Sequence, residues 1–148
     1  MRVWIDADAC PAVIREVLFR AADRRGIETT LVANHFIAKP RSPHIRAVQV
    51  EAGFDRADDY IAEQVLPGDL VITGDIPLAA RVVESGGTAL NPRGTLYDTE
   101  SIREHLGRRD FMEELRSAGV QTGGPSSLSK SDVQTFANAL DRFLARSR

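Results

Sequence analysis

A chain of 148 residues can bury a sheet under helices on both faces and is of the size of one domain, expected to span 1–148. The net charge of −2 excludes a strongly basic coat for nucleic acid, although a local basic groove stays compatible with it. The single cysteine, Cys10, excludes a disulfide framework and a multi-cysteine zinc site, and without a signal-like or membrane-spanning apolar run we expect a cytoplasmic protein with no membrane partner.

The chain opens with a short apolar run that ends on two carboxylates. Residues 3–5 have the continuous apolar character of a buried parallel strand, and Asp6 and Asp8 follow. Apolar residues then recur at helical spacing up to Gly26, which predicts a helix directly after the strand. Asp6 needs an explanation, because a carboxylate is costly to bury unless it is paired, hydrogen-bonded or metal-bound.

Strands and helices alternate along the rest of the predicted fold. Strands are expected at 27–33, 45–50, 69–73 and 88–90, and helices are expected to begin near Asp55, Asp75, Asp98 or Thr99, and Ser131. Ser131 and Gln134 have capping-box spacing, and the segment 123–127 before them predicts a linker. The alternation indicates an α/β protein of three layers, with a mostly parallel sheet of four or five strands, flanking helices and C-terminal helices.

Carboxylates gather at the carboxyl edge of this predicted sheet. Asp6 and Asp8 follow the first strand and Asp75 follows the fourth, while Asp58 lies on the inward stripe of the helix before the fourth strand. That helix starts near the same edge, so we expect Asp58 close to Asp6 and Asp75. Crowded carboxylates repel each other unless a divalent cation neutralises them. The pattern predicts a Mg²⁺ or Mn²⁺ site for phosphate chemistry, with Asp6, Asp58, Asp75 and Asp8 as ligands.

Each acid also has a structural alternative. Asp8 and Asp75 stand where helix N-caps stand, and Asp58 can complement a helix dipole. Thr73 is predicted to support the site by holding a carboxylate or a metal-bound water. Asp59, which points further round its helix than Asp58, is also predicted to be a supporting residue.

Three cations on loops are predicted to contact substrate phosphates. Arg93 follows the fifth strand, and Lys39 and Arg41 lie in the long basic loop after the second strand. Lone Arg and Lys side chains on loops are more often simply solvated. Cys10 is interpreted as a packed free thiol, because no histidine is placed beside it as a base.

Three segments of the chain, 5–11, 68–79 and 91–94, resemble the YaiI/YqxD family of uncharacterised bacterial proteins. That family is similar in turn to PIN-domain nucleases, whose acids after strands one and four correspond to Asp6 and Asp75. The PIN-like pattern of an Asp three residues before an Ile falls on Asp58 and Ile61. The resemblance implies a PIN-like fold and a metal-dependent ribonuclease in which Asp6, Asp58 and Asp75 are catalytic and RNA is the partner. These nucleases usually carry a further Glu, and neither Glu16 nor Glu51 is a secure match for it.

Two other functions are compatible with these residues. The spacing of Asp6 and Asp8 resembles the D-x-D motif of haloacid-dehalogenase-type phosphatases, with Asp6 as nucleophile. Those enzymes need a lysine and a second acid, but Ala79 stands at the acid position and the only lysines are Lys39 and Lys130. A non-catalytic RNA- or protein-binding module is the third reading, and a protein partner or homo-oligomer is left open.

Overall fold

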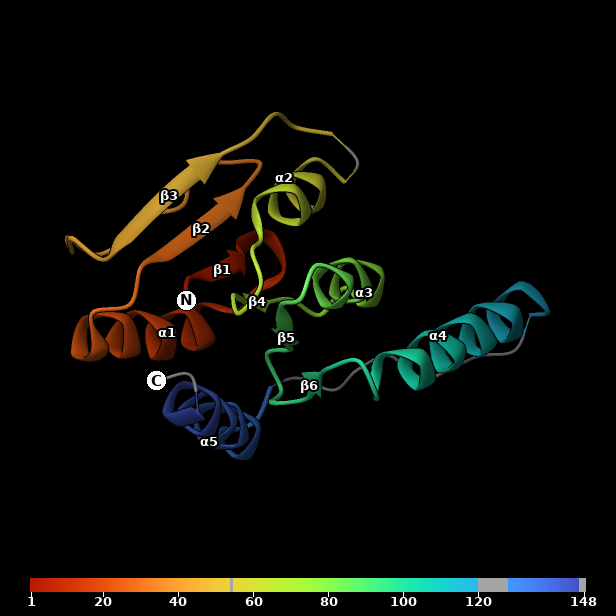
Figure 1. Ribbon diagram of the computed structural model, residues 1–148. Helices are drawn as coiled ribbons and strands as arrows, with labels where there is room; N and C mark the ends of the chain where they lie inside the picture. The colour runs from red at the N-terminus through yellow and green to blue at the C-terminus, as the bar shows by residue number, and fades with distance from the viewer. Residues whose placement is uncertain (54, 120–127, 147–148) are drawn as a thin grey trace.

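The centre of the structure is a six-stranded sheet in the order β3-β2-β1-β4-β5-β6 (Figure 1). This computed structural model describes residues 1–53, 55–119 and 128–146. The first five strands are parallel to their neighbours and β6 is antiparallel to β5. The strands are β1 (Val3–Asp6), β2 (Thr29–Ala33), β3 (Ile45–Gln49), β4 (Leu70–Ile72), β5 (Thr88–Leu90) and β6 (Leu96–Tyr97). The predicted α/β class and mostly parallel sheet are confirmed, with one strand more than expected.

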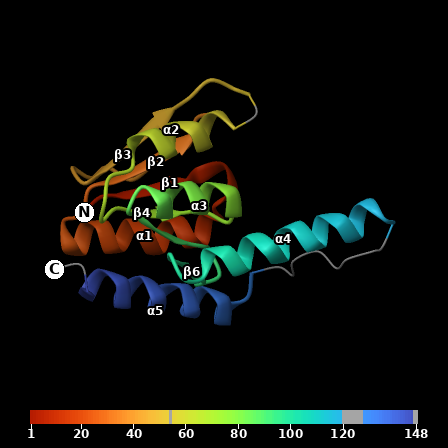
Figure 2. The same ribbon diagram turned by 45° about the vertical axis from the view of Figure 1, so that its right-hand side comes forward.

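The described ranges contain five helices, and a short 3-10 turn, η1 (Ala7–Ala9), separates β1 from the first of them. The helices are α1 (Ala12–Arg25), α2 (Arg56–Gln64), α3 (Ile76–Glu84), α4 (Ile102–Ser117) and α5 (Lys130–Arg146). Figure 2 shows α1 and α5 side by side on one face, α2 and α3 on the other, and α4 projecting from the body. No helix in the described ranges is long and apolar enough to cross a membrane. The predicted linker at 123–127 lies outside the described residues.

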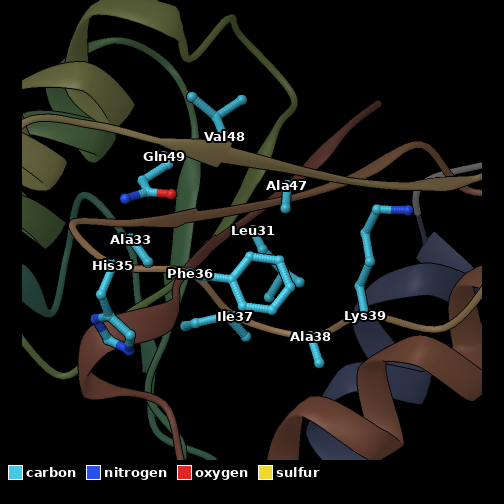
Figure 3. Close-up of a pocket in the computed structure, with 10 residues that line it drawn as sticks. All are labelled: Leu31, Ala33, His35, Phe36, Ile37, Ala38, Lys39, Ala47, Val48 and Gln49. Atoms are coloured by element: carbon cyan, nitrogen blue, oxygen red, sulfur yellow. The ribbon is translucent and has the colours of Figure 1, made fainter.

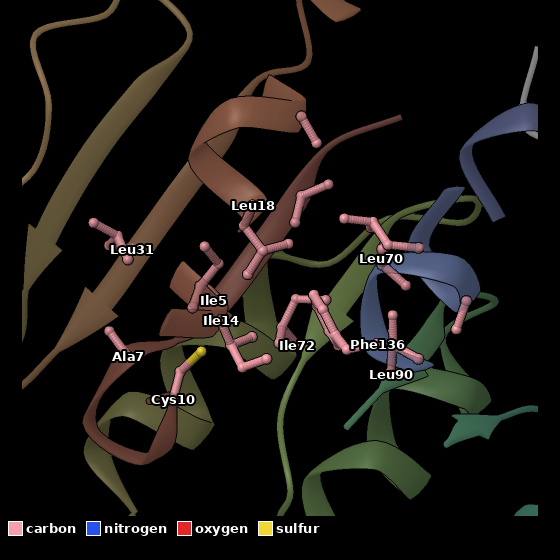
Figure 4. Close-up of a cluster of buried hydrophobic side chains, with 14 of the residues drawn as sticks. Ile5, Ala7, Cys10, Ile14, Leu18, Leu31, Leu70, Ile72, Leu90 and Phe136 are labelled. Atoms are coloured by element: carbon pink, nitrogen blue, oxygen red, sulfur yellow. The ribbon is translucent and has the colours of Figure 1, made fainter. Parts of the chain in front are cut away.

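Alternation along the strands divides the apolar side chains between two faces. Val3 and Ile5 pack with α1 and α5, in the cluster of Figure 4, whereas Trp4 packs with Ile61 of α2 and Val82 of α3. A strand has a side-chain period of two, so residues 3 and 5 share one face and residues 4 and 6 share the other. Asp6 therefore emerges on the face that α2 and α3 cover.

The two-residue strand β6 was not predicted, because it is too short to carry a periodic pattern. A turn closes β5 onto β6, with the Gly94 amide donating to the Asn91 carbonyl. Gly94 has φ +95°, and a Cβ there would stand 2.8 Å from Thr135 Cγ2 of α5. Only glycine fits this turn, which fixes the outer edge of the sheet against the last helix.

Helix ends agree with the sequence in part. Gly26 ends α1 in the left-handed conformation, as its position predicts. α2 begins after Asp55, as expected, but the Asp55 side chain accepts no capping hydrogen bond at this N-cap position. The capping box of α5 is formed by Ser129 and Asp132, whose side chains each accept the other's backbone N–H. The predicted box of Ser131 and Gln134, two residues further along the chain, is therefore wrong.

Candidate metal and catalytic site

The candidate site lies where the chain order in the sheet reverses. From β1 the chain proceeds through β2 to β3 on one side, and β4 and β5 then fill the other side of β1. The crevice at the carboxyl ends of two such strands is where open α/β sheets bind ligands. Asp6 ends β1, and Asp75 follows β4 immediately before α3. Topology alone therefore brings these two carboxylates to the two sides of the crevice.

Asp6 is buried, with 5% of its surface exposed, and Thr73 holds it. The Thr73 hydroxyl donates to Asp6 Oδ2 at 3.0 Å and accepts the Asp75 backbone N–H at 3.0 Å. Burial raises the pKa of Asp6, the Thr73 hydrogen bond lowers it, and the charges of Asp75 and Asp8 raise it, so that the pKa lies above its ordinary value. Thr73 thus fixes one carboxylate and the backbone of the other.

Asp75 is the N-cap of α3. Its Oδ1 accepts the backbone N–H of Leu78 at 2.9 Å, and Pro77 stands in the first turn. The structural alternative for this residue is correct. The cap also holds the carboxylate rigidly at the mouth of the crevice, so a cap and a ligand can be the same side chain.

Asp58 comes to the same place from α2. Its pKa is raised to about 7, first by burial, then by the charges of Asp75 and Asp6 and a hydrogen bond with the Asp75 side chain. The structure therefore brings Asp6, Asp58 and Asp75 together, as the order of strands and helices leads one to expect. The charge of Asp75 raises the pKa of both Asp6 and Asp58, and this crowding of negative charge is the electrostatic condition that favours a bound cation.

A cleft of about 300 Å³ opens beside this cluster. Its acidic side carries Asp55, Asp58 and Asp75, and Arg81 of α3 and Arg109 of α4 line it as well. Arg81 pairs with Asp59 at 2.8 Å, so Asp59 faces a cation rather than the other acids. The sequence offered no signal for these two arginines, because their positions depend on how α3 and α4 pack.

Asp8 is directed elsewhere. Its Oδ2 accepts the Asn34 backbone N–H at 3.0 Å, and its Oδ1 lies 2.8 Å from His35 Nδ1. Neither contact belongs to the cleft, and α1 has Pro11 at its N-cap without a side-chain capping bond. The predicted N-cap role of Asp8 is therefore wrong, and the side chain instead ties η1 to the loop after β2.

The remaining sequence candidates lie outside the acidic cleft. Arg93 pairs with Asp132 of α5 at 2.8 Å. Lys39 lines a separate cavity beside β2 and β3. Arg41, Glu16 and Glu51 are exposed and do not line the cleft. Burial raises the pKa of the Cys10 thiol to about 12, which agrees with a packed, unreactive side chain.

The comparisons with known proteins bear on the whole chain. The sequence model of the family described as "Uncharacterized BCR, YaiI/YqxD family" matches residues 4–146. The chain belongs to the YaiI/YqxD family. It is 62% identical to a UPF0178 protein of Dechloromonas aromatica, over 99% of this chain and 97% of that one. It is 61% identical to a UPF0178 protein of Aeromonas hydrophila, over 100% and 99% of the two chains. No solved structure matches it.

The donor chemistry of this YaiI/YqxD protein fits a hard divalent cation. Within the described part of the chain, no three Asp, Glu, His or Cys side chains converge as a ready-made metal cage. Mg²⁺ rarely needs one, because it is commonly held by one or two carboxylates together with waters and substrate phosphates. Asp6 and Asp75, each oriented by one hydrogen bond, match that requirement.

Proposed function

We propose that this protein is a Mg²⁺- or Mn²⁺-dependent phosphodiesterase that acts on RNA at the acidic cleft beside the carboxyl ends of β1 and β4. One observation carries the proposal. Three carboxylates from separate elements, Asp6, Asp58 and Asp75, interact at the topological switch point of the sheet. Such crowding is unfavourable to folding, and a role in cation binding explains why a fold would keep it.

The residues divide the work as follows. Asp6 and Asp75 would hold the cation, since Thr73 and the Leu78 backbone N–H fix their carboxylates. When bound, such a cation polarises a phosphoryl oxygen and increases the acidity of a water. Asp58 would accept the proton of the attacking water, because its carboxyl lies beside Asp6 and Asp75 and lines the cleft that the substrate would enter.

The two arginines of the cleft support an anionic substrate. Arg81 and Arg109 line the same cleft as Asp58 and Asp75, so a phosphodiester chain in the cleft would meet cations as well as the acids. RNA is the substrate class that the resemblance to PIN-domain nucleases implies. The phosphatase function has less support, because neither lysine of the chain lines the cleft and Ala79 stands where these enzymes need a second acid.

Cleavage of a labelled single-stranded RNA in Mn²⁺ tests the proposal. Asp6→Asn and Asp75→Asn preserve shape, and Asn can still cap α3, so both should fold normally while cleavage falls at least about a hundredfold. Asp141→Asn is the matched control, because Asp141 is exposed and pairs with Arg24 on the surface, away from the cleft. EDTA should stop cleavage by the wild type. If the wild type, Asp6→Asn and Asp75→Asn cleave the RNA at equal rates, the proposed function is wrong.

Mn²⁺ binding measured by calorimetry separates the cation from the reaction. The wild type should bind Mn²⁺ without RNA present, and Asp6→Asn should bind it at least about tenfold more weakly. If Asp6→Asn binds Mn²⁺ as the wild type does, Asp6 is not a ligand. Formation of a phospho-aspartate at Asp6 from a phosphate ester would instead establish the phosphatase reading.

A further inference from the structure

A second cavity, of about 430 Å³, lies on the opposite face of the sheet, under the outer strands β2 and β3. Its roof is the α1-facing side of these strands, where Leu31 stands opposite Ala47. Its other wall is the loop 34–44, which leaves the carboxyl end of β2 and runs back beneath the sheet (Figure 3). The size is that of a small-molecule site.

The ring of Phe36 is the unusual feature of this cavity. Phe36 lines the cavity but is 80% exposed, the most exposed of the large apolar side chains described. Figure 3 shows the ring beneath Leu31 and Ala47. An exposed ring contributes little to the stability of the fold, whereas a ring facing an apolar surface forms a slot in which a flat, aromatic group can stack.

Polar groups stand at the two ends of the slot. His35 and Gln49 lie at one end and Lys39 at the other (Figure 3). The Gln49 amide offers both a donor and an acceptor, which suits the edge of a nucleobase, and the Lys39 ammonium suits a phosphate. The loop 34–44 contains Lys39 and Arg41 and no acidic residue, so its charge complements a polyanion.

The cavity is also connected to the acidic site. His35, at one end of the slot, lies 2.8 Å from Asp8, which stands two residues after Asp6 at the carboxyl end of β1. Both sites therefore open at the carboxyl edge of the sheet, one on each face. A single strand of nucleic acid passing this edge can contact both.

We propose that the cavity between Phe36 and the β2–β3 surface binds one unpaired base of a single-stranded RNA, so that the strand reaches the acidic cleft. This inference rests on the proposed function, because it assigns the same substrate, and it adds that the substrate must have an unpaired base. A peptide that paired with the outer edge of β3 would be a different partner. The cationic, acid-free loop and the exposed ring favour the nucleic acid.

Binding without divalent cations tests this proposal separately from cleavage. In EDTA, a fluorescent RNA of six adenosines or six uridines is titrated with the 148-residue protein. Phe36→Ala should weaken binding at least about fivefold, the lower end of what one stacked base contributes, while Phe36→Trp stays within twofold of the wild type. Phe36 is exposed, so neither change should unfold the protein. Phe111→Ala is the matched control, since it removes another exposed ring, on α4, and should leave the affinity unchanged.

The position of binding and the role of the base need two more measurements. Amide chemical shifts of residues 35–39 and 47–49 should change on addition of the same RNA, and a fully paired RNA duplex should bind more weakly than the single strand. Asp141→Asn, at an exposed carboxylate away from both cavities, should bind the single strand as the wild type does. If wild type and Phe36→Ala bind equally, or if the shifts fall elsewhere, the base site is wrong even when Mn²⁺-dependent cleavage is found. If the base site is found without cleavage, the phosphodiesterase alone is wrong.

Discussion

The hydroxyl of Thr73 lies 3.0 Å from Asp6 Oδ2 and joins the ends of two neighbouring strands. The same oxygen accepts the backbone N–H of Asp75, so one side chain fixes the carboxylate of β1 and the start of α3. All three residues stand at the carboxyl edge between β1 and β4. Their rigidity there is what a site needs if it is to hold a cation or a reacting group in one place.

Replacing Thr73 with Val should destabilise the protein by about 1–3 kcal/mol, because a buried carboxylate and a backbone N–H each lose a partner. Urea unfolding followed by circular dichroism measures this change. Thr73→Ser keeps the hydroxyl and should recover most of the loss. Thr99→Val, at an exposed threonine, is the matched control. If Thr73→Val and Thr99→Val are equally stable, the hydroxyl has no structural role.

Asp58 should make stability depend on pH. Its folded pKa of about 7 lies above the ordinary value of 3.8, so between these values the folded state binds more protons than the unfolded state. Without divalent cations, stability should therefore fall as pH rises from about 4 to about 7 and level off above that. Solvent screening of a half-buried group should limit the effect of Asp58 to about 1 kcal/mol.

Asp58→Asn tests this dependence. The variant should be more stable than the wild type at pH 8, and the difference should vanish near pH 4, as measured by urea unfolding in EDTA. Asp141→Asn, at an exposed carboxylate, should keep the pH profile of the wild type. If the free energy of unfolding changes between pH 4 and pH 7 by the same amount in the wild type and in Asp58→Asn, the prediction is wrong.

Much of the site was predictable because parallel strands bring their carboxyl ends to one edge. That rule places Asp6 and Asp75 together from the sequence of strands and helices alone, and the helical stripe adds Asp58. The direction of the Asp8 side chain was not predictable in this way. It depends on the 3-10 turn η1 and on the backbone N–H of Asn34, which is distant in sequence.

Other differences arise where two local patterns compete. Ser129 with Asp132 and Ser131 with Gln134 have the same spacing, and the first pair forms the box because α5 begins at Lys130. The position of Arg109 in the cleft cannot be predicted from local sequence patterns, because it depends on the packing of α4 against α3.

Asp69 is a buried carboxylate that no sequence pattern singled out. It stands at the opposite end of β4 and accepts hydrogen bonds from the backbone N–H groups of Arg2 and Leu66 and from Trp4 Nε1. Asp69→Ala should cost about 3–5 kcal/mol, because three donors and the Arg2 guanidinium lose their partner. Urea unfolding measures this cost, and Asp69→Asn should retain part of the stability. A loss below 1 kcal/mol for Asp69→Ala would contradict the assignment of Asp69 as the main tie between β1 and β4 at this end.

Arg109 should affect substrate binding more than turnover. It lines the cleft beside Asp58 and Asp75, so Arg109→Gln should raise the KM for single-stranded RNA about five- to tenfold with kcat nearly unchanged. The slope of the logarithm of the binding constant against the logarithm of the salt concentration should become shallower by the contribution of about one phosphate contact. Arg108→Gln is a close control, because Arg108 lies next to it on α4 but is 62% exposed and pairs with Glu104. Equal KM values for the two variants would mean that the cleft does not receive the phosphate chain. A loss of kcat without a change in KM would instead give Arg109 a role in the transition state, where developing charge on the phosphate needs a cation.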